Sequence, residues 1–231
     1  MKIYTLSQLA RYIPGKIFMF IGRVILAERM GVKKSSSVLS VFFEAIISTS
    51  GAFFAILILY VFSSKIKIEW LNPMKIGLLI GGGLLILNPK FIKIILNKIY
   101  QIRYAREFDF PSINFGYYKI ILLCFYYVII WVLVGISFYL LVSSFLGELI
   151  SLKVVFDIPC IFLISWIVGF LSFITPGGIG VREAIMTIGL AQILPLHLVS
   201  IIAIISRIWF TIGEVLVVVI LYLIPKKVSS D

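Results

Sequence analysis

Charged residues are scarce in this chain. Only 13% of its 231 residues are Asp, Glu, Lys or Arg, whereas 61% are hydrophobic, and the mean hydropathy is +1.15. Ordinary soluble domains carry roughly 25% charged residues. The composition therefore excludes a typical soluble fold and predicts an integral membrane protein.

The residues that most enzymes use for catalysis or metal binding are also rare. His197 is the only histidine, and no Cys or carboxylate stands at ligand spacing from it, so we interpret it as an interfacial residue. Cys124 and Cys160 lie within apolar runs, which favours small buried side chains over a disulfide. The Walker spacing is missing and no hydrolase motif occurs. We expect no metal, no cofactor and no enzymatic activity.

Acidic residues are outnumbered by basic ones, 10 against 21, which gives a net charge of +11. The basic residues lie between apolar segments, so they indicate membrane orientation and not a nucleic-acid partner. Residues 1–34 carry seven Lys or Arg and one acid, and residues 88–119 carry six and two. The positive-inside rule predicts that both stretches are cytoplasmic, and Lys226 and Lys227 predict a cytoplasmic carboxyl terminus. The expected location is the cytoplasmic (cell) membrane, crossed several times.

Long apolar runs predict an all-α polytopic bundle in a single membrane domain, residues 1–231. A helix needs roughly 20 residues to cross a hydrocarbon core of about 30 Å. Three segments are long enough to span: 38–62, 119–142 and 198–224. Four others are shorter or interrupted: 13–30, 74–99, 158–175 and 181–194. Charge alone permits two arrangements of residues 158–194, either two short spans or one hairpin that re-enters from outside.

The run from Thr175 to Glu183, Thr-Pro-Gly-Gly-Ile-Gly-Val-Arg-Glu, interrupts this apolar sequence. Irregular backbone at membrane depth persists only where protein or water surrounds it. Proline ends the preceding helix, and the glycines permit unusual dihedral angles before a new helix begins. The amino terminus of that helix, with a nearby Arg, is suited to bind an anion. The site residues predicted here are Pro176, Gly177, Gly178, Gly180, Arg182 and Glu183.

A similar pattern occurs near the amino terminus, where Pro14, Gly15 and Lys16 precede a short apolar segment and then a long one. Gly15 lies 29 positions before Glu44, and Gly177 lies 30 positions before Arg207. The two long segments run in opposite directions in the predicted topology. Inverted repeats with Gly or Pro interruptions are typical of transporters that bind substrate near the midplane. The alternative is a chance similarity between two apolar segments.

Several ionisable residues lie within or beside the apolar segments. Such residues are costly in a membrane and usually face a functional interior. Glu44 is either part of a site, or a structural ion pair or protonated carboxyl group. Arg182 and Glu183 either bind a ligand or neutralise each other. Arginine can grip phosphate with two parallel hydrogen bonds. The remaining charged candidates are Arg23, Arg207 and Glu214. Glu214 lies on approximately the same helix face as Arg207, which makes it a candidate partner for that arginine.

The sequence resembles a flippase-like family in a set of residues and motifs that occur in the expected order. They are Arg11-Tyr12-Ile13-Pro14-Gly15-Lys16, Gly22-Arg23, Glu44, Asn88-Pro89-Lys90, the Pro176–Glu183 motif and Arg207. This family is related to the transmembrane region of lysylphosphatidylglycerol synthase. The resemblance implies a membrane protein that translocates or handles a lipid with an anionic or amino-acylated headgroup, in some members for surface-polysaccharide synthesis. Members usually carry further helices before the first Pro-Gly element, which suggests an amino-terminally shortened form, and the aminoacyltransferase domain is missing from this sequence.

The expected function is movement of a phospholipid or lipid-linked glycan between leaflets. The residues expected to line a polar cavity are Glu44, Arg182, Glu183 and Arg207. The alternatives are a lipid-binding scaffold subunit of an envelope pathway and a small-solute transporter. Expected partners are membrane lipids, and in addition a glycosyltransferase or a second copy of the chain.

Overall fold

The computed structural model describes residues 17–66, 73–88, 94, 98, 101, 116–146, 154–172, 175 and 178–223. Every extended regular element in this part of the chain is an α-helix, and no strand occurs there. The prediction of an all-α bundle is confirmed.

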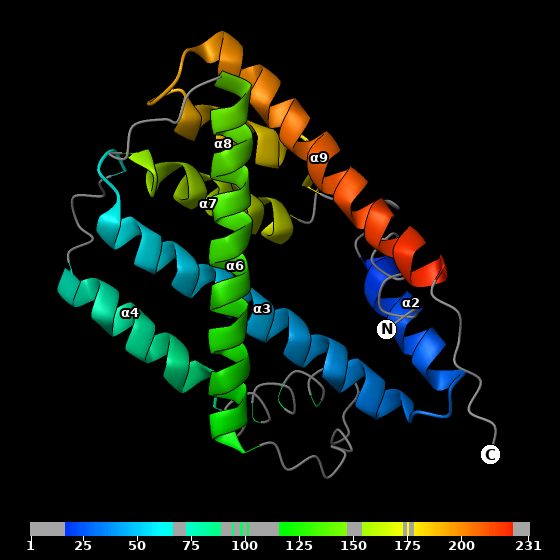
Figure 1. The fold of residues 1–231 in the computed structure, drawn as a ribbon. Coiled ribbons are helices and arrows are strands. Elements are labelled where there is room, and N and C mark those ends of the chain that lie inside the picture. Colours follow the sequence, from blue (N-terminus) through cyan, green and yellow to red (C-terminus); the bar gives the residue numbers. More distant parts are fainter. Residues whose placement is uncertain are drawn as a thin grey trace.

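Three long helices form the frame of the molecule (Figure 1). They are α3 (Lys34–Phe62), α6 (Tyr117–Leu146) and α9 (Leu196–Leu223). With 29, 30 and 28 residues, each is about 42–45 Å long at 1.5 Å per residue. All three are long and apolar enough to cross a membrane, as the sequence predicted for these segments.

The shorter helices are α2 (Ile17–Glu28), α4 (Pro73–Ile86), α7 (Asp157–Leu171) and α8 (Val181–Leu190). They contain 12, 14, 15 and 10 residues, fewer than the roughly 20 that a span requires. Helix α4 ends before Leu87 and Asn88, which fits the conformational restriction that Pro89 places on the residue before it. The rest of the predicted segment 74–99 lies almost entirely outside the described residues.

Helices α7 and α8 pack extensively against each other. Asp157, the first residue of α7, contacts the Ser63–Ile66 segment at the carboxyl end of α3. Only five residues separate the end of α8 from the start of α9, and Figure 1 shows that start at the same end of the molecule. The chain therefore enters and leaves the α7–α8 pair on one side. Both alternatives have this arrangement, but helices of 15 and 10 residues are short for a span, which favours the re-entrant hairpin.

Small residues let the helices approach closely, as is typical where lipid supplies little driving force for association. A Cβ atom built on Gly51 of α3 would lie 2.6 Å from Tyr127 Cβ on α6. One built on Gly135 of α6 would lie 2.9 Å from Pro159 Cβ on α7. Stacked aromatic rings fill the space beyond: Phe138 and Phe162 have ring centroids 4.5 Å apart. The core is thus fixed by glycine contacts and ring stacking between α3, α6 and α7.

The carboxylate of Asp157 ties two distant segments together. It is completely buried, and it accepts hydrogen bonds from the hydroxyl groups of Ser63 and Ser64 and from the backbone amides of Ser64, Lys65 and Ile66. Burial by itself raises the pKa of a carboxyl group, but here the hydrogen bonds outweigh it and hold the pKa of Asp157 below its ordinary value. The ionised form therefore stabilises the fold.

We predict that Asp157→Asn lowers the stability of the purified protein by about 2–4 kcal/mol, because the amide replaces one acceptor oxygen with a donor that faces other donors. Since the pKa is depressed in the fold, this contribution is complete above the pKa of the unfolded state and is lost as the pH falls toward the folded value. Thermal unfolding in detergent between pH 3 and pH 7 measures it. Equal acid sensitivity of the two proteins over that range would contradict the assignment.

We also predict that Gly51→Ala destabilises the bundle by about 1–3 kcal/mol. The new methyl group would meet the backbone of α6 as well as the side chain of Tyr127, so the two helices must separate. Gly213→Ala is the matched control, because a Cβ on that helical residue meets nothing within 4 Å. Thermal unfolding in the same detergent should show a drop for the first variant only.

Candidate functional site

The first ion pair joins α2 to α3. Arg23 Nη1 lies 2.7 Å from Glu44 Oε2, and Arg23 is only 7% exposed. The connection between the helices turns at Gly31, whose φ of +83° favours glycine. A short, charge-assisted bond between a buried arginine and a partly buried carboxylate is strong. The α2–α3 unit thus presents its charges as a local pair.

Helix α6 supports this pair from a second side. Tyr127 of α6 lies against Gly51, two helical turns beyond Glu44 on α3. One helical turn beyond Glu44, the Ser48 carbonyl accepts a hydrogen bond of 3.0 Å from the Trp131 indole. The turn that carries Glu44 is therefore fixed against α6.

The second ion pair joins α8 to α9. Arg207 Nη1 donates a short hydrogen bond to Glu183 Oε1, and the backbone amide of Gly180 donates to Glu183 Oε2 at 2.7 Å. Glu183 stands in the first turn of α8, where a carboxylate complements the free amides and the helix dipole. The Glu183 carboxylate thus accepts a hydrogen bond from the amide at the start of α8 and also pairs with the arginine of α9.

Arg182 takes a different path along α7. Its Cγ would be only 2.0 Å from a Cβ built on Gly169, so its stem lies directly over that glycine. Its Cζ lies 6.0 Å from the centroid of the Phe162 ring, within cation–π range. Gly178, with φ of +73°, approaches the Gly169 carbonyl, which would be 2.7 Å from a Cβ at that position. Sequence reasoning missed Gly169, because one glycine in an apolar helix gives no distinctive signal.

Helix α9 presents a half-buried stripe beyond Ser206. Arg207, Phe210, Thr211 and Glu214 are all partly buried and, at spacings of three and four, share one face. Of the residues from 207 to 220, none is fully buried. Phe210 stacks on Phe162, with centroids 5.1 Å apart. This stripe therefore carries the polar groups of α9 on the side toward the bundle.

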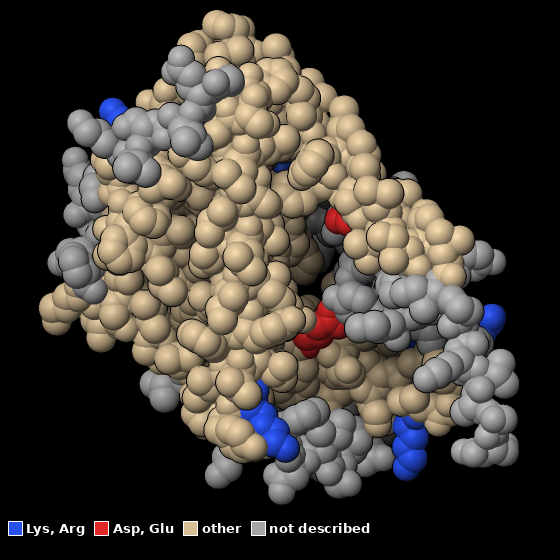
Figure 2. Space-filling view, in the orientation of Figure 1, with Lys and Arg blue, Asp and Glu red and all other residues tan. Residues whose placement is uncertain are grey.

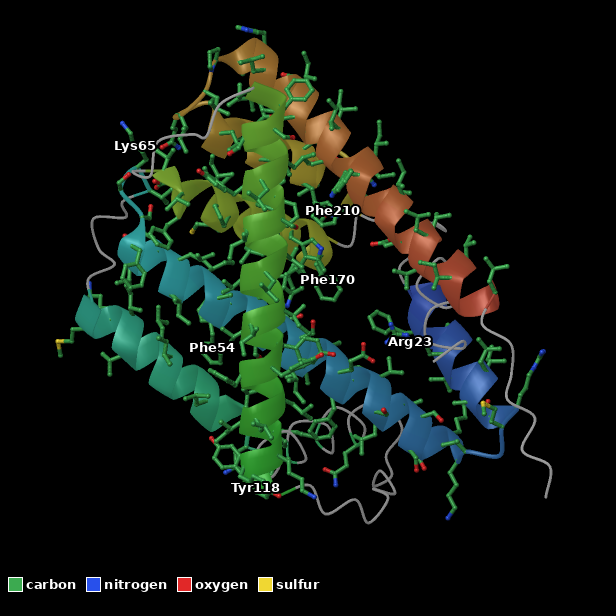
Figure 3. The ribbon with its side chains drawn as sticks, in the orientation of Figure 1. Arg23, Phe54, Lys65, Tyr118, Phe170 and Phe210 are labelled. Carbon is green, nitrogen blue, oxygen red and sulfur yellow. The ribbon has the colours of Figure 1, made fainter. Side chains whose placement is uncertain are left out.

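Figure 2 shows that this face of the molecule is hollowed between α6 and α9, with acidic side chains visible inside. The acids of the helices around it are Glu44, Glu183 and Glu214. In Figure 3, Arg23, Phe170 and Phe210 lie on the same side of α6 as this hollow. We call it the lateral hollow. Its name refers to its place beside α6 and α9 in this view.

The two ion-paired units are inverted and carry their charges in reverse. In the first, the short helix supplies Arg23 and the long helix Glu44, whereas in the second the short helix supplies Glu183 and the long helix Arg207. Figure 1 shows α3 and α9 running in opposite directions. Glu44 and Arg207 lie about 15–17 Å from the starts of their helices at 1.5 Å per residue. Opposite directions of the two long helices are what an inverted repeat requires, and the repeat itself stays a prediction.

The sequence predicted one polar cavity shared by the charged residues, whereas the structure pairs them within neighbouring helices, α2 with α3 and α8 with α9. Both oxygens of Glu183 bond elsewhere, to Arg207 and Gly180, so this carboxylate is more than a counterion for Arg182. Glu44 is bonded to Arg23 within its own unit. Glu214 is on the same face as Arg207, but the carboxylate that pairs with Arg207 is Glu183 and not the Glu214 that the sequence suggested. The predicted residues Pro14, Gly15, Lys16, Pro176 and Gly177 lie outside the described residues.

The chemistry available at this site is ionic recognition. Two arginines and two carboxylates stand as pairs beside the lateral hollow, and aromatic rings border them. Among the described residues, no cluster of three or more His, Cys, Asp or Glu has the arrangement to hold a metal ion. Arginine in a partly desolvated setting binds phosphate strongly, and each carboxylate can compete for the same arginine.

We predict that Glu44→Gln lowers stability by about 3–5 kcal/mol, because it removes the countercharge of the buried Arg23. The exchange Arg23→Glu with Glu44→Arg should restore a large part of the loss. Arg29→Gln is the control, since Arg29 is an exposed residue next to the same helix and should change stability by less than about 0.5 kcal/mol. Thermal unfolding in detergent compares all four proteins. A Glu44→Gln protein as stable as the original would contradict the pairing.

Comparisons with known proteins give one match. No curated protein and no solved structure matches the chain. The family model described as the lysylphosphatidylglycerol synthase TM region matches residues 2–222. This match agrees with the helical membrane fold and places the protein among membrane proteins of lipid or envelope pathways. The chain therefore belongs to the family of the lysylphosphatidylglycerol synthase transmembrane region.

Proposed function

We propose that this protein moves a phosphate-bearing lipid, a phospholipid or a lipid-linked glycan, between the leaflets of the cytoplasmic membrane. The observation that carries the proposal is the presence of two inverted Arg–Glu pairs, Arg23–Glu44 and Glu183–Arg207, beside a lateral hollow. The protein is transporter-like and catalyses no covalent step, and its carboxyl terminus lies on the cytoplasmic side.

The cost of burying charge supports a functional role for these pairs. Replacing a buried ion pair with well-packed apolar residues is often neutral or stabilising, so stability alone gives little reason to place two pairs inside an apolar bundle. Ionisable residues within membrane segments usually mark the path of a substrate or an ion. Two pairs in inverted units fit a path that can be approached from either leaflet.

A phosphate can replace a carboxylate at each arginine. When a headgroup phosphate binds Arg207, Glu183 keeps the hydrogen bond that its Oε2 accepts from the Gly180 amide. The carboxylate therefore remains partly satisfied while its arginine is engaged, and this lowers the cost of the exchange. The same arginine returns to Glu183 after the headgroup leaves.

The apolar outer face of α9 beside this hollow favours a lipid over a soluble solute. Helix α9 exposes apolar side chains such as Ile208, Ile212 and Leu216 on its outer side, while its polar stripe faces the bundle. A lipid tail can stay in the bilayer while the headgroup follows the polar groups. A carrier for small solutes would instead need a water-filled chamber closed off from lipid.

Reconstituted vesicles test this function directly. We expect the protein to move a fluorescent phosphatidylglycerol analogue between leaflets, measured by dithionite quenching with and without an imposed membrane potential and pH gradient. Arg207→Gln should slow the movement at least about tenfold, since a charge-assisted bond contributes roughly 1.5–3 kcal/mol. Arg29→Gln is the matched control and should match the unchanged protein.

Two outcomes would contradict the proposal. If the lipid moves no faster than in protein-free vesicles under every imposed gradient, translocation is ruled out as the function. Lipid that binds and depends on Arg207 but never crosses would instead favour a scaffold that presents lipid to another protein.

A further inference from the structure

We propose that Gly169 is a positioning residue of the headgroup site: because it has no side chain, it creates the notch that fixes Arg182. This inference rests on the proposed function, since it assigns Arg182 a fixed place in the headgroup path. Gly169 is buried near the carboxyl end of α7. A glycine inside a helix destabilises that helix relative to alanine, so its presence here needs a reason from packing.

The stem of Arg182 fills the space that a side chain would occupy. A Cβ on Gly169 would lie 2.0 Å from Cγ, 2.8 Å from Cδ and 3.4 Å from Cβ of Arg182. The first two distances are well below van der Waals contact, and they involve consecutive atoms of the stem. The arginine cannot keep this path over any residue larger than glycine.

The turn before α8 uses the same notch. A Cβ on Gly178 would lie 2.7 Å from the Gly169 carbonyl oxygen and 3.1 Å from its Cα, and the φ of Gly178 is +73°. The backbone of the turn thus touches α7 at the residue over which Arg182 extends. Gly169 therefore determines how closely the start of α8 approaches α7, as well as the path of the Arg182 side chain.

The notch determines where the guanidinium lies. Phe162 stands seven positions before Gly169, two turns away on the same face of α7. Arg182 extends from the notch to this ring, with Cζ 6.0 Å from its centroid. The ring is itself held between Phe138 and Phe210, with centroids 4.5 and 5.1 Å away. The ring that the guanidinium approaches therefore also stacks on Phe210, a member of the α9 stripe that carries Arg207.

The two arginines of this unit then have different roles. Arg207 bonds to Glu183 and can exchange that carboxylate for a phosphate. Arg182 has its stem over Gly169, and its guanidinium lies near Phe162. It provides a fixed contact for the headgroup phosphate while Arg207 exchanges partners.

A double-mutant cycle in reconstituted vesicles tests the inference. We expect Gly169→Ala and Arg182→Gln each to slow movement of the fluorescent phosphatidylglycerol analogue at least about fivefold, and the double variant to be no slower than either, because both remove the same placed group. Gly22→Ala is the control, since a Cβ there meets nothing within 4 Å. Independent, multiplicative losses, or a Gly169→Ala protein with unchanged transport beside a slow Arg182→Gln protein, would overturn the positioning role.

A second readout does not depend on transport. In a background with Cys124→Ala and Cys160→Ala, the thiol introduced by Arg182→Cys should change its reaction rate with a methanethiosulfonate reagent at least about threefold when Gly169→Ala is added, because the notch places it. An unchanged rate overturns the inference even if the protein moves no lipid. If Gly169→Ala alone fails to fold, Gly169→Ala with Arg182→Ala should fold again, since the clashing stem atoms are gone; continued failure would also overturn it.

Discussion

The pairing of every buried charge is the constraint on which this structure depends. An ion or backbone amide in an apolar bundle must find a partner within the protein. Asp157 meets this constraint by accepting hydrogen bonds from the Ser63–Ile66 segment, and Glu183 meets it by serving the start of α8 and Arg207 together. These contacts join the ends of short helices to long ones. The same bonds that satisfy the charges therefore hold the α7–α8 hairpin in place.

Glycine is the second constraint, because it decides how closely the helices of the core pack. Gly51 and Gly135 bring α3, α6 and α7 together, and Gly169 admits the stem of Arg182. With larger residues at these positions the neighbouring helix or side chain would have to move away. The ion pairs join α2 to α3 and α8 to α9, so the glycine contacts fix the core on which those pairs are mounted.

The sequence contained the helices and the charged residues but not the identity of their partners. Hydrophobic length predicted α3, α6 and α9, since a spanning helix is long and uniformly apolar. Glu44 and Arg207 were predicted as site residues because a charged side chain is costly to place within a membrane segment. Which groups they bond depends on tertiary approach, so Arg23 as the partner of Glu44 and Glu183 as the partner of Arg207 were not assigned. Asp157 looked like an ordinary loop acid, because its donors lie more than 90 positions away.

The two ion pairs differ in burial, and this difference gives the proposed path an order. The side chain of Arg23 is 8% exposed, whereas that of Arg207 is 27% exposed. A headgroup that binds Arg207 gives up less water than one that binds Arg23, and desolvation is the main cost of placing an ion in a protein interior. In the proposed mechanism the headgroup therefore engages the α8–α9 pair with the smaller barrier. Transfer to the α2–α3 pair is then the costlier step, because Arg23, the more buried of the two paired arginines, must exchange Glu44 for the headgroup.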